Sequence, residues 1–222
     1  MRRRAVIVRR PTEFDELMDR YSTRGQVEFV LRSRGRTLES VERAHESHVA
    51  ALARVRVGIP DGWASADVER DSLSRFLFAP EDVIVVVGPD GLVANVAKYV
   101  DTQVVVGINS VPESQAGVLV RCAPEEGICA LRRLDEGADL RVDHLTMVQA
   151  SVDDSRSLRA LNEVFIGHPS HQSARYELRA GSVVERQSSS GLVVSTGTGA
   201  TGWGASLKRG RHMGELPAPT SR

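Results

Sequence analysis

The sequence has few lysines, cysteines and aromatic residues, and it has no long apolar run. Only Lys98 and Lys208 are lysines, yet Lys and Arg together number 29 and balance an Asp and Glu total of 29. A net charge of zero argues against nucleic acid as the main partner, because binding a phosphate backbone requires a basic surface. No apolar run approaches the roughly 18 residues of a membrane span. The "AVIV" that follows the basic start is too short for a signal-peptide core. We therefore expect a cytoplasmic protein with small-molecule partners and no membrane partner.

Two familiar motifs are also missing. The cysteines, Cys122 and Cys129, do not have the spacing of a metal site, and free buried thiols are the interpretation we favour for a cytoplasmic chain. A P-loop is excluded because no G-x-x-x-x-G-K-[ST] occurs. If the protein binds phosphate, it must do so by another arrangement.

The first part of the chain, residues 1–112, alternates apolar strands with amphipathic helices. Thr12 is a candidate cap for the first helix. The later strands are apolar throughout, as expected for parallel strands that are covered on both faces. The predicted strands are 5–8, 26–31, 83–87 and 103–108, and the predicted long helices are 12–21 and 37–55. This order predicts an α/β domain with a doubly wound parallel sheet.

Two histidines of the helix 37–55, His45 and His48, lie three residues apart on its apolar stripe. At this spacing they could reach one metal ion. No third ligand is evident nearby in the sequence, so we favour packing at the edge of the core.

The pattern changes after about residue 110. A last helix is predicted at 125–137, and strand-and-turn patterns follow it, including a hairpin around Gly181. Residues 113–222 therefore predict a second, β-rich domain. The Pro-containing tail is predicted to be irregular.

The first candidate site is Gly88-Pro89-Asp90-Gly91, which directly follows the strand 83–87. Glycine and aspartate at a strand end are usual in structural turns. In open parallel sheets, however, ligands collect at the carboxyl ends of the strands. A phosphate loop and a plain turn are therefore both consistent with this stretch taken alone.

Two further candidates lie in the second half. The stretch 189–206, "SSGLVVSTGTGATGWGAS", combines glycines with hydroxyl side chains, so its backbone can approach a ligand closely while the hydroxyls bond to it. A flexible linker has a similar composition, but the preceding "LVV" and the tryptophan favour a ligand loop. In 160–167, "ALNEVFIG", the polar pair Asn162-Glu163 interrupts an apolar run. The pair marks either a bulge or an amide and a carboxylate suited to ribose hydroxyls.

These stretches, together with "VGIN" at 106–109, resemble the motifs of the NAD kinase family in order and spacing. That family has a Gly-Gly-Asp-Gly-Thr loop, a Gly-hydrophobic-Asn stretch, Leu-Asn-Glu/Asp, and a glycine-rich loop with threonines. Here the resemblance runs from about residue 82 to 206. The Ser-Ser-Gly, the Thr-Gly-Thr-Gly and the tryptophan look most like the mitochondrial-type branch and its bacterial relatives.

The resemblance implies transfer of the ATP γ-phosphoryl group to the 2′-hydroxyl of the NAD adenosine ribose, with Mg²⁺ as cofactor and NAD as substrate. The resemblance further implies that residues 1–112 form an α/β nucleotide-binding domain, that residues 113–222 form a β-rich NAD-binding domain, and that the active site lies between them. We also expect a homodimer. Asp90 matches the catalytic aspartate, which assists deprotonation of the hydroxyl or holds the magnesium ion. The positions matching nucleotide-binding residues are Gly88, Gly91, Asn162, Glu163, Thr198, Gly199, Thr201, Trp203 and Ser206.

The sequence departs from the family pattern at two loop positions. Pro89 replaces the second glycine and removes one backbone N–H, and Leu92 replaces the threonine and removes a hydroxyl. The chain also ends at Arg222, whereas family members continue through further strands, so the sequence is either that of a shortened family member or a fragment. An alternative function is therefore a catalytically weak or inactive relative that binds NAD or a similar nucleotide as a sensor or partner subunit. A kinase of another small substrate, such as a lipid or sugar, is the third alternative.

Overall fold

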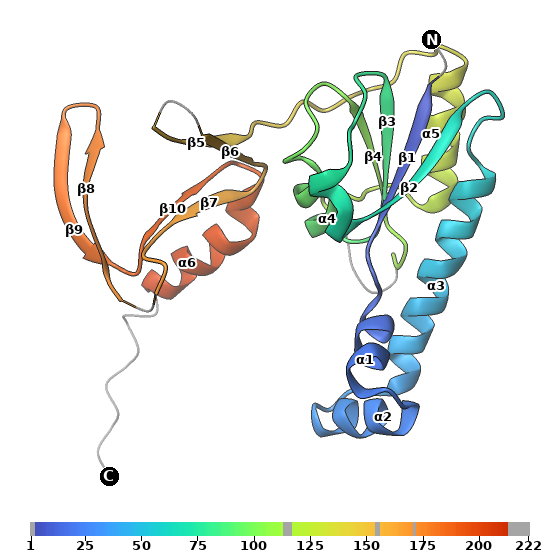
Figure 1. Ribbon diagram of the computed structural model, residues 1–222, viewed down its shortest axis with the longest axis horizontal. Helices are drawn as coiled ribbons and strands as arrows, with labels where there is room; N and C mark the ends of the chain where they lie inside the picture. The colour runs from blue at the N-terminus through green and yellow to red at the C-terminus, as the bar shows by residue number, and fades with distance from the viewer. Residues whose placement is uncertain (1–2, 113–116, 154–155, 171, 213–222) are drawn as a thin grey trace. The chain divides into compact units, whose positions relative to one another are not determined.

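The structure, a computed structural model, describes residues 3–112, 117–153, 156–170 and 172–212 (Figure 1). The chain forms two compact units, Met1–Val142 and Asp143–Arg222. The sequence suggested a boundary after residue 112. The compact units divide later because the segment after β4 packs on the first unit, where Ile108 forms a parallel bridge to Cys122 and helix α5 contacts α3 and β4.

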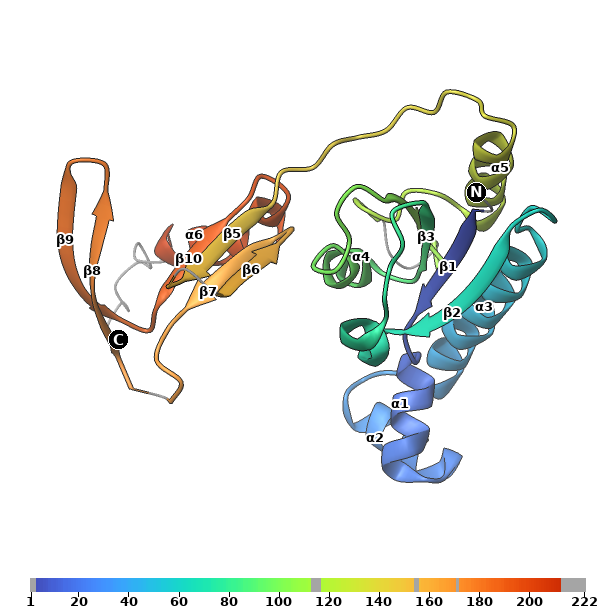
Figure 2. The same cartoon turned by 45° about the horizontal axis from the view of Figure 1, so that its top comes forward.

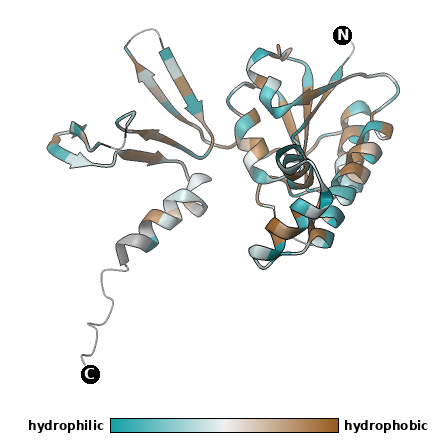
Figure 3. Cartoon of the chain, turned by 60° about the horizontal axis from the view of Figure 1, so that its bottom comes forward, coloured by the Kyte–Doolittle hydropathy of each residue, from teal (hydrophilic) through white to brown (hydrophobic). Residues whose placement is uncertain are grey.

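A four-stranded sheet forms the centre of the first unit. Its strands are β1 (Arg4–Arg9), β2 (Ala64–Glu69), β3 (Asp82–Val87) and β4 (Val104–Ile108). They lie in the order β2-β1-β3-β4, and every neighbouring pair is parallel. The central strands are almost entirely hydrophobic (Figure 3), since both of their faces are covered.

Helices cover both faces of this sheet (Figures 1 and 2). Side chains of α3 and α5 pack in one core cluster with alternate residues of β1, β3 and β4. The opposite face of β1 and β3 is also fully buried, and α4 lies on that side. The helical elements are α1 (Glu13–Tyr21), α2 (Arg24–Ser33), α3 (Leu38–Val57), the 3-10 helix η1 (Arg70–Arg75), α4 (Asp90–Val96) and α5 (Pro124–Asp135). The first unit is therefore an α/β domain, as the sequence predicted.

The predicted strand at 26–31 is wrong, because these residues belong to helix α2. Thr23 caps the helix, and its side chain accepts a hydrogen bond from the backbone N–H of Gln26. Val27 and Leu31, four residues apart, are buried on one helical face against α1 and α3. The apolar pattern of "QVEFVL" fits both the two-residue period of a strand and the 3.6-residue period of a helix. The Thr23 cap and the burial of residues four positions apart favour the helix.

Strand β2 was not predicted from the sequence. It lies at the edge of the sheet, and Val68 is its one fully buried residue. An edge strand with so little burial carries almost no hydrophobic pattern. Its pairing with β1 therefore depends on the sheet rather than on its own sequence.

The strand order determines where a ligand site can form. From β1 the chain first adds β2 on one side of the sheet and then adds β3 and β4 on the other side, so the strand order switches between β1 and β3. In open α/β sheets, ligands bind outside the carboxyl ends of the strands at such a switch point. The segments that leave β1 and β3 at this point begin with Arg10 and Gly88.

The second unit contains three separate antiparallel ladders of two strands each among its described residues. One of them, β8–β9, is the predicted hairpin, and Gly181 in its turn has φ +59°, a conformation suited to glycine. The ladders pair β5 (Val148–Val152) with β6 (Arg156–Ala160), β7 (Glu163–Ile166) with β10 (Leu192–Ser195), and β8 (Ala174–Ala180) with β9 (Val183–Ser189). The unit is β-rich, as expected.

The second half of the glycine-rich stretch is helical, although the sequence suggested a loop. A short 3-10 helix, η2 (Gly199–Thr201), is followed by helix α6 (Trp203–His212). The cysteines also differ from expectation, because both are free but Cys129 is exposed and Cys122 only partly buried. Among the described residues, none of the helices combines the length and the apolar character required to cross a bilayer.

Candidate functional site

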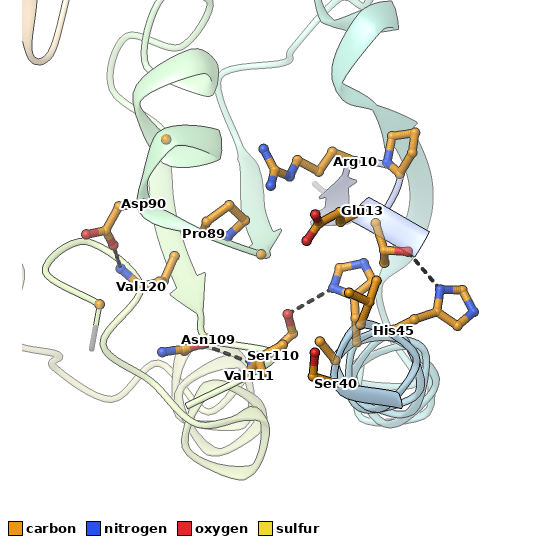
Figure 4. A pocket seen from close by; sticks show the side chains of 18 of the residues that line it. Arg10, Glu13, Ser40, His45, Pro89, Asp90, Asn109, Ser110, Val111 and Val120 are labelled. Atoms are coloured by element: carbon orange, nitrogen blue, oxygen red, sulfur yellow. Dashed lines mark hydrogen bonds between the residues drawn. The ribbon is translucent and has the colours of Figure 1, made fainter. Parts of the chain in front are cut away.

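A cavity of about 540 Å³ opens at the switch point of the sheet, lined only by residues of the first unit. The loops that follow β1, β3 and β4 all contribute to it, together with one face of α3 (Figure 4). The lining residues are Arg10, Pro11, Thr12, Glu13, Arg36, Ser40, Val41, Ala44, His45, His48, Gly88, Pro89, Asp90, Gly91, Asn109, Ser110, Val111, Gly117 and Val120. All four residues of the first candidate site thus face this cavity.

The Asp90 carboxylate is bound to the backbone of a distant loop. Its Oδ2 accepts a hydrogen bond of 2.8 Å from the N–H of Val118, and its Oδ1 accepts bonds of 2.8 and 2.9 Å from the N–H groups of Leu119 and Val120. A carboxylate has about four lone-pair sites. Three of them are occupied, so one site on Oδ2 remains for a proton or a cation.

The residues around Asp90 determine the shape of the loop. Gly88 has φ +150°, which side-chain-bearing residues rarely adopt, and its N–H donates to the carbonyl of Ile108 at 3.0 Å. Pro89 is the N-cap of α4 and has no N–H to offer. Leu92, which stands where the family has threonine, is 1% exposed and belongs to the core. A Cβ on Gly91 would meet no atom within 4 Å, so the protein itself leaves that space open.

Charged side chains from the β1 end of the cavity form a small network. Arg36 makes two hydrogen bonds to the Glu13 carboxylate. This contact lowers the pKa of Glu13, with Arg10 adding a weaker effect of the same sign. Glu13 is therefore ionised at neutral pH and already partnered.

His45 and His48 lie on the predicted face of helix α3, and both line the cavity. His45 Nδ1 lies 2.8 Å from Thr12 Oγ1 and 3.5 Å from Asp15 Oδ1. His48 is 6% exposed, its Nδ1 lies 2.9 Å from Ser110 Oγ, and its buried Nε2 has no hydrogen-bond partner among the described residues. Burial lowers the pKa of His48, so the imidazole is neutral at pH 7.

The other candidate residues lie in the second unit, where two of the predicted stretches meet. The N–H of Thr196 donates to the carbonyl of Asn162 at 2.9 Å, and Thr196 Oγ1 donates to the carbonyl of Leu161 at 2.6 Å. A Cβ on Gly199 would lie 2.1 Å from the Asn162 carbonyl oxygen, so this position requires glycine. The "ALNE" stretch and the glycine-rich stretch therefore form one structural element.

Glu163 begins β7 opposite Ser195 of β10. Its Oε2 is buried and accepts no hydrogen bond from any residue that the structure describes. A buried carboxylate oxygen without a donor costs free energy. A ligand hydroxyl placed there would remove that cost.

The remaining predicted residues lie around the start of α6. Trp203 is 45% exposed, and its ring lies 5.7 Å between centroids from the ring of Phe165. Ser206 is exposed, and its N–H donates to the carbonyl of Gly202. Thr198 precedes η2 and Thr201 ends it.

The sequence GTGATG at 197–202 has the G-x-G-x-x-G spacing of the dinucleotide-binding fingerprint. That motif works between a strand and a helix of a parallel βαβ unit. Here the preceding strand, β10, pairs antiparallel with β7. The spacing therefore does not indicate a Rossmann site.

Several cavity residues were not selected from the sequence. Arg10 and Thr12 follow a predicted strand, so the rule that selected residues 88–91 would have reached them too. Ser40 and Arg36 lack such a signal, because their place beside the cavity follows from the packing of α3 and α2.

The described part of the chain has no group of three or more His, Cys, Asp or Glu side chains arranged as metal ligands. A magnesium ion carried in with a nucleotide needs only one or two protein carboxylates besides the phosphates. The free lone pair of Asp90 Oδ2 fits that smaller requirement.

No family model matches the chain. The chain is similar to NAD kinase 2, mitochondrial, from Rattus norvegicus, with 26% identity over 258 aligned positions that cover 93% of this chain. The chain spans 60% of the length of that protein. This distant similarity extends over both units and supports a relationship to the NAD kinase family.

Proposed function

We propose that the protein is a NAD kinase-like phosphotransferase that moves the γ-phosphoryl group of ATP to the 2′-hydroxyl of the NAD adenosine ribose. The observation that carries the proposal is the cavity at the switch point, lined by Gly88, Asp90 and Gly91. The similarity to a mitochondrial NAD kinase over 93% of the chain supports the same reaction.

The site chemistry suits phosphoryl transfer, which depends mainly on positioning and on neutralising charge. Asp90 is held by three backbone N–H groups, so its carboxylate has a fixed direction. Its remaining lone pair would take the proton of the attacking hydroxyl or hold Mg²⁺. Bound with the nucleotide, Mg²⁺ would neutralise charge on the transferred group.

The second unit would hold NAD. Asn162 and Glu163 would bind the ribose hydroxyls, and the buried Oε2 of Glu163 supports this role because it lacks a donor within the described residues. Trp203 offers an exposed aromatic face for a base. Thr198, Gly199, Thr201 and Ser206 would line the same nucleotide.

The test is an assay of NADP formation by the purified protein with ATP, magnesium and NAD. NADP that depends on both ATP and NAD supports the proposal, and inorganic polyphosphate in place of ATP identifies the donor. A folded protein that makes no NADP contradicts it. Size-exclusion chromatography of the same sample tests the expected homodimer.

A second candidate is an inactive relative that binds NAD or a similar nucleotide. Two observations favour it: three donors already occupy the Asp90 carboxylate, and Pro89 removes a donor from the loop. Calorimetric binding of NAD without NADP formation would support this function over the kinase.

A further inference from the structure

Arg10 differs from the other arginines at the β1 end of the sheet. Arg9 pairs with Glu69 at 3.7 Å, and Arg36 pairs with Glu13. Arg10 lines the cavity, and within the described ranges its side chain donates no hydrogen bond and forms no ion pair. A guanidinium carries five N–H donors, and those of Arg10 are therefore available to a ligand in the cavity.

The sheet places Arg10 beside the loop 88–91. Strands β1 and β3 are paired in parallel with Val8 opposite Val86. Continuing this register by two residues puts Arg10 opposite Gly88, where both strands leave the sheet. Figure 4 shows the Arg10 side chain extending toward Pro89.

The loop has a deficit that Arg10 can correct. A phosphate loop binds its anion through successive backbone N–H groups, and Pro89 has none. The N–H of Gly88 is also unavailable, because it donates to Ile108. Donors on this side of the cavity must therefore come from a side chain.

The anion must also be able to reach Arg10 without competition from the two acidic residues that line the cavity. Of these, Glu13 has both carboxylate oxygens bound by Arg36. The other cavity carboxylate, Asp90, is bound to the backbone of residues 118–120. Both carboxylates are thus hydrogen-bonded to other groups, while the Arg10 guanidinium acts on Glu13 only at a distance and has no hydrogen bond or ion pair among the described residues.

We infer that Arg10 binds the phosphoryl oxygens of the nucleotide triphosphate and supplies the donors that Pro89 removes from the loop. This inference rests on the proposed function, because that function brings a triphosphate to the cavity. The planar guanidinium can donate two parallel hydrogen bonds to one phosphate. Arg10 is therefore a binding residue for the donor nucleotide.

The test compares Arg10→Gln and Arg10→Lys with a matched control, Arg9→Gln. Arg9 is the preceding residue, has the same side chain and does not line the cavity. Calorimetry measures the affinities of ATP with magnesium and of inorganic tripolyphosphate, and thermal melting checks that each variant is folded.

We expect Arg10→Gln to lower the affinity for both ligands by about 10- to 100-fold, the effect of losing a charge-assisted hydrogen bond. Arg10→Lys should lose less, because it keeps the charge but not the paired geometry. Arg9→Gln should bind both ligands within about threefold of the unchanged protein, since only a surface ion pair is lost.

The outcomes distinguish the role of Arg10 from the proposed kinase activity. If Arg10→Gln binds tripolyphosphate as well as the unchanged protein does, the inference is wrong even when NADP is formed. If tripolyphosphate binding depends on Arg10 but no NADP is formed, the inference holds and the kinase proposal fails. If the unchanged protein binds neither ATP nor tripolyphosphate, the inference is overturned.

Discussion

Asp90 Oδ1 accepts a hydrogen bond of 2.9 Å from the backbone N–H of Val120, across thirty positions of the chain. Together with the bonds from Val118 and Leu119, this contact ties the segment after β4 to the start of α4. The proposed catalytic carboxylate is therefore also a structural support, and its substitution affects stability as well as chemistry.

Asp90→Asn tests both roles. The asparagine side chain would place its NH₂ group where the Asp90 carboxylate now accepts hydrogen bonds from backbone N–H groups. Because two donors cannot bond to each other, we expect the unfolding free energy to fall by about 1–3 kcal/mol. If the carboxylate also acts as a general base, NADP formation should fall by about 100- to 10,000-fold. Urea titration and the NADP assay measure the two effects. Asp61→Asn, at an exposed position, is the control. Turnover unchanged from that of the control would remove Asp90 from the mechanism.

Pro89→Gly restores one backbone N–H to the loop. We expect tighter ATP binding or faster turnover, with stability lower by roughly 1 kcal/mol because glycine raises the entropy of the unfolded chain. Calorimetry with ATP and thermal melting of both proteins provide the comparison. A loss of stability with no change in ATP affinity would identify residues 88–91 as a plain turn.

Gly91→Ala tests whether glycine at position 91 serves ligand binding rather than the folding of the protein. The added Cβ meets nothing within 4 Å, and alanine favours a helix by up to about 1 kcal/mol over glycine, so stability should be kept or improved. ATP affinity should fall, because the ligand would occupy that space. Gly199→Ala is the contrasting variant and should destabilise the protein, since its Cβ would lie 2.1 Å from the Asn162 oxygen. Undiminished ATP binding by Gly91→Ala would count against the phosphate loop.

Glu163→Ala should weaken NAD binding by about 10- to 100-fold, the cost of losing a charge-assisted hydrogen bond. The same change should leave stability unchanged or raise it, because it removes a buried oxygen that has no donor among the described residues. Calorimetry and urea unfolding report the two effects, with the exposed Glu185→Ala as control. Unaltered NAD affinity in the folded variant would return Asn162 and Glu163 to a structural role.

His48 should make stability depend on pH. Burial is the main cause that lowers its pKa; His45, Arg10 and Arg9 lower it further, and Asp15 acts in the opposite direction. The unfolded chain therefore takes up this proton first as pH falls. Unfolding free energy should decrease below about pH 6.5 until the lower folded pKa is reached.

The measurement is urea unfolding at pH 7.5 and 5.5. His48→Gln should show a smaller decrease in unfolding free energy between these pH values than the unchanged protein. His144→Gln, at an exposed position, should behave like the unchanged protein. Equal decreases in all three proteins would show that His48 does not contribute.

The sequence predicted the elements whose burial is strong. Strands β1 and β3 are apolar apart from charged residues at their ends, and the predicted cap of α1 by Thr12 is confirmed. The reciprocal contact of Asp15 with Thr12 was not predicted. Edge strand β2 could not be recognised, because its hydrogen bonds come from β1 and its side chains are mostly outside the core. Hydrophobic periodicity reports burial and does not report pairing.

The candidate site shows the same division. The strand-end rule led to residues 88–91, and the structure places them at the cavity wall. The partners of Asp90 lie far along the chain, and no local pattern marks residues 118–120 as donors. Backbone donors have no residue-type signature, so such contacts emerge only from the fold.

The contrast between the two sheet types has a consequence for hydrogen exchange and proteolysis. Strands β1 and β3 are bonded on both sides, whereas each described strand of the second unit has one unbonded edge. Isolated two-stranded ladders open easily, so their amides should exchange with solvent long before those of β1 and β3. Residues 138–147, in neither helix nor strand, should be where a protease first cuts the chain, which would release the first unit as the more resistant fragment.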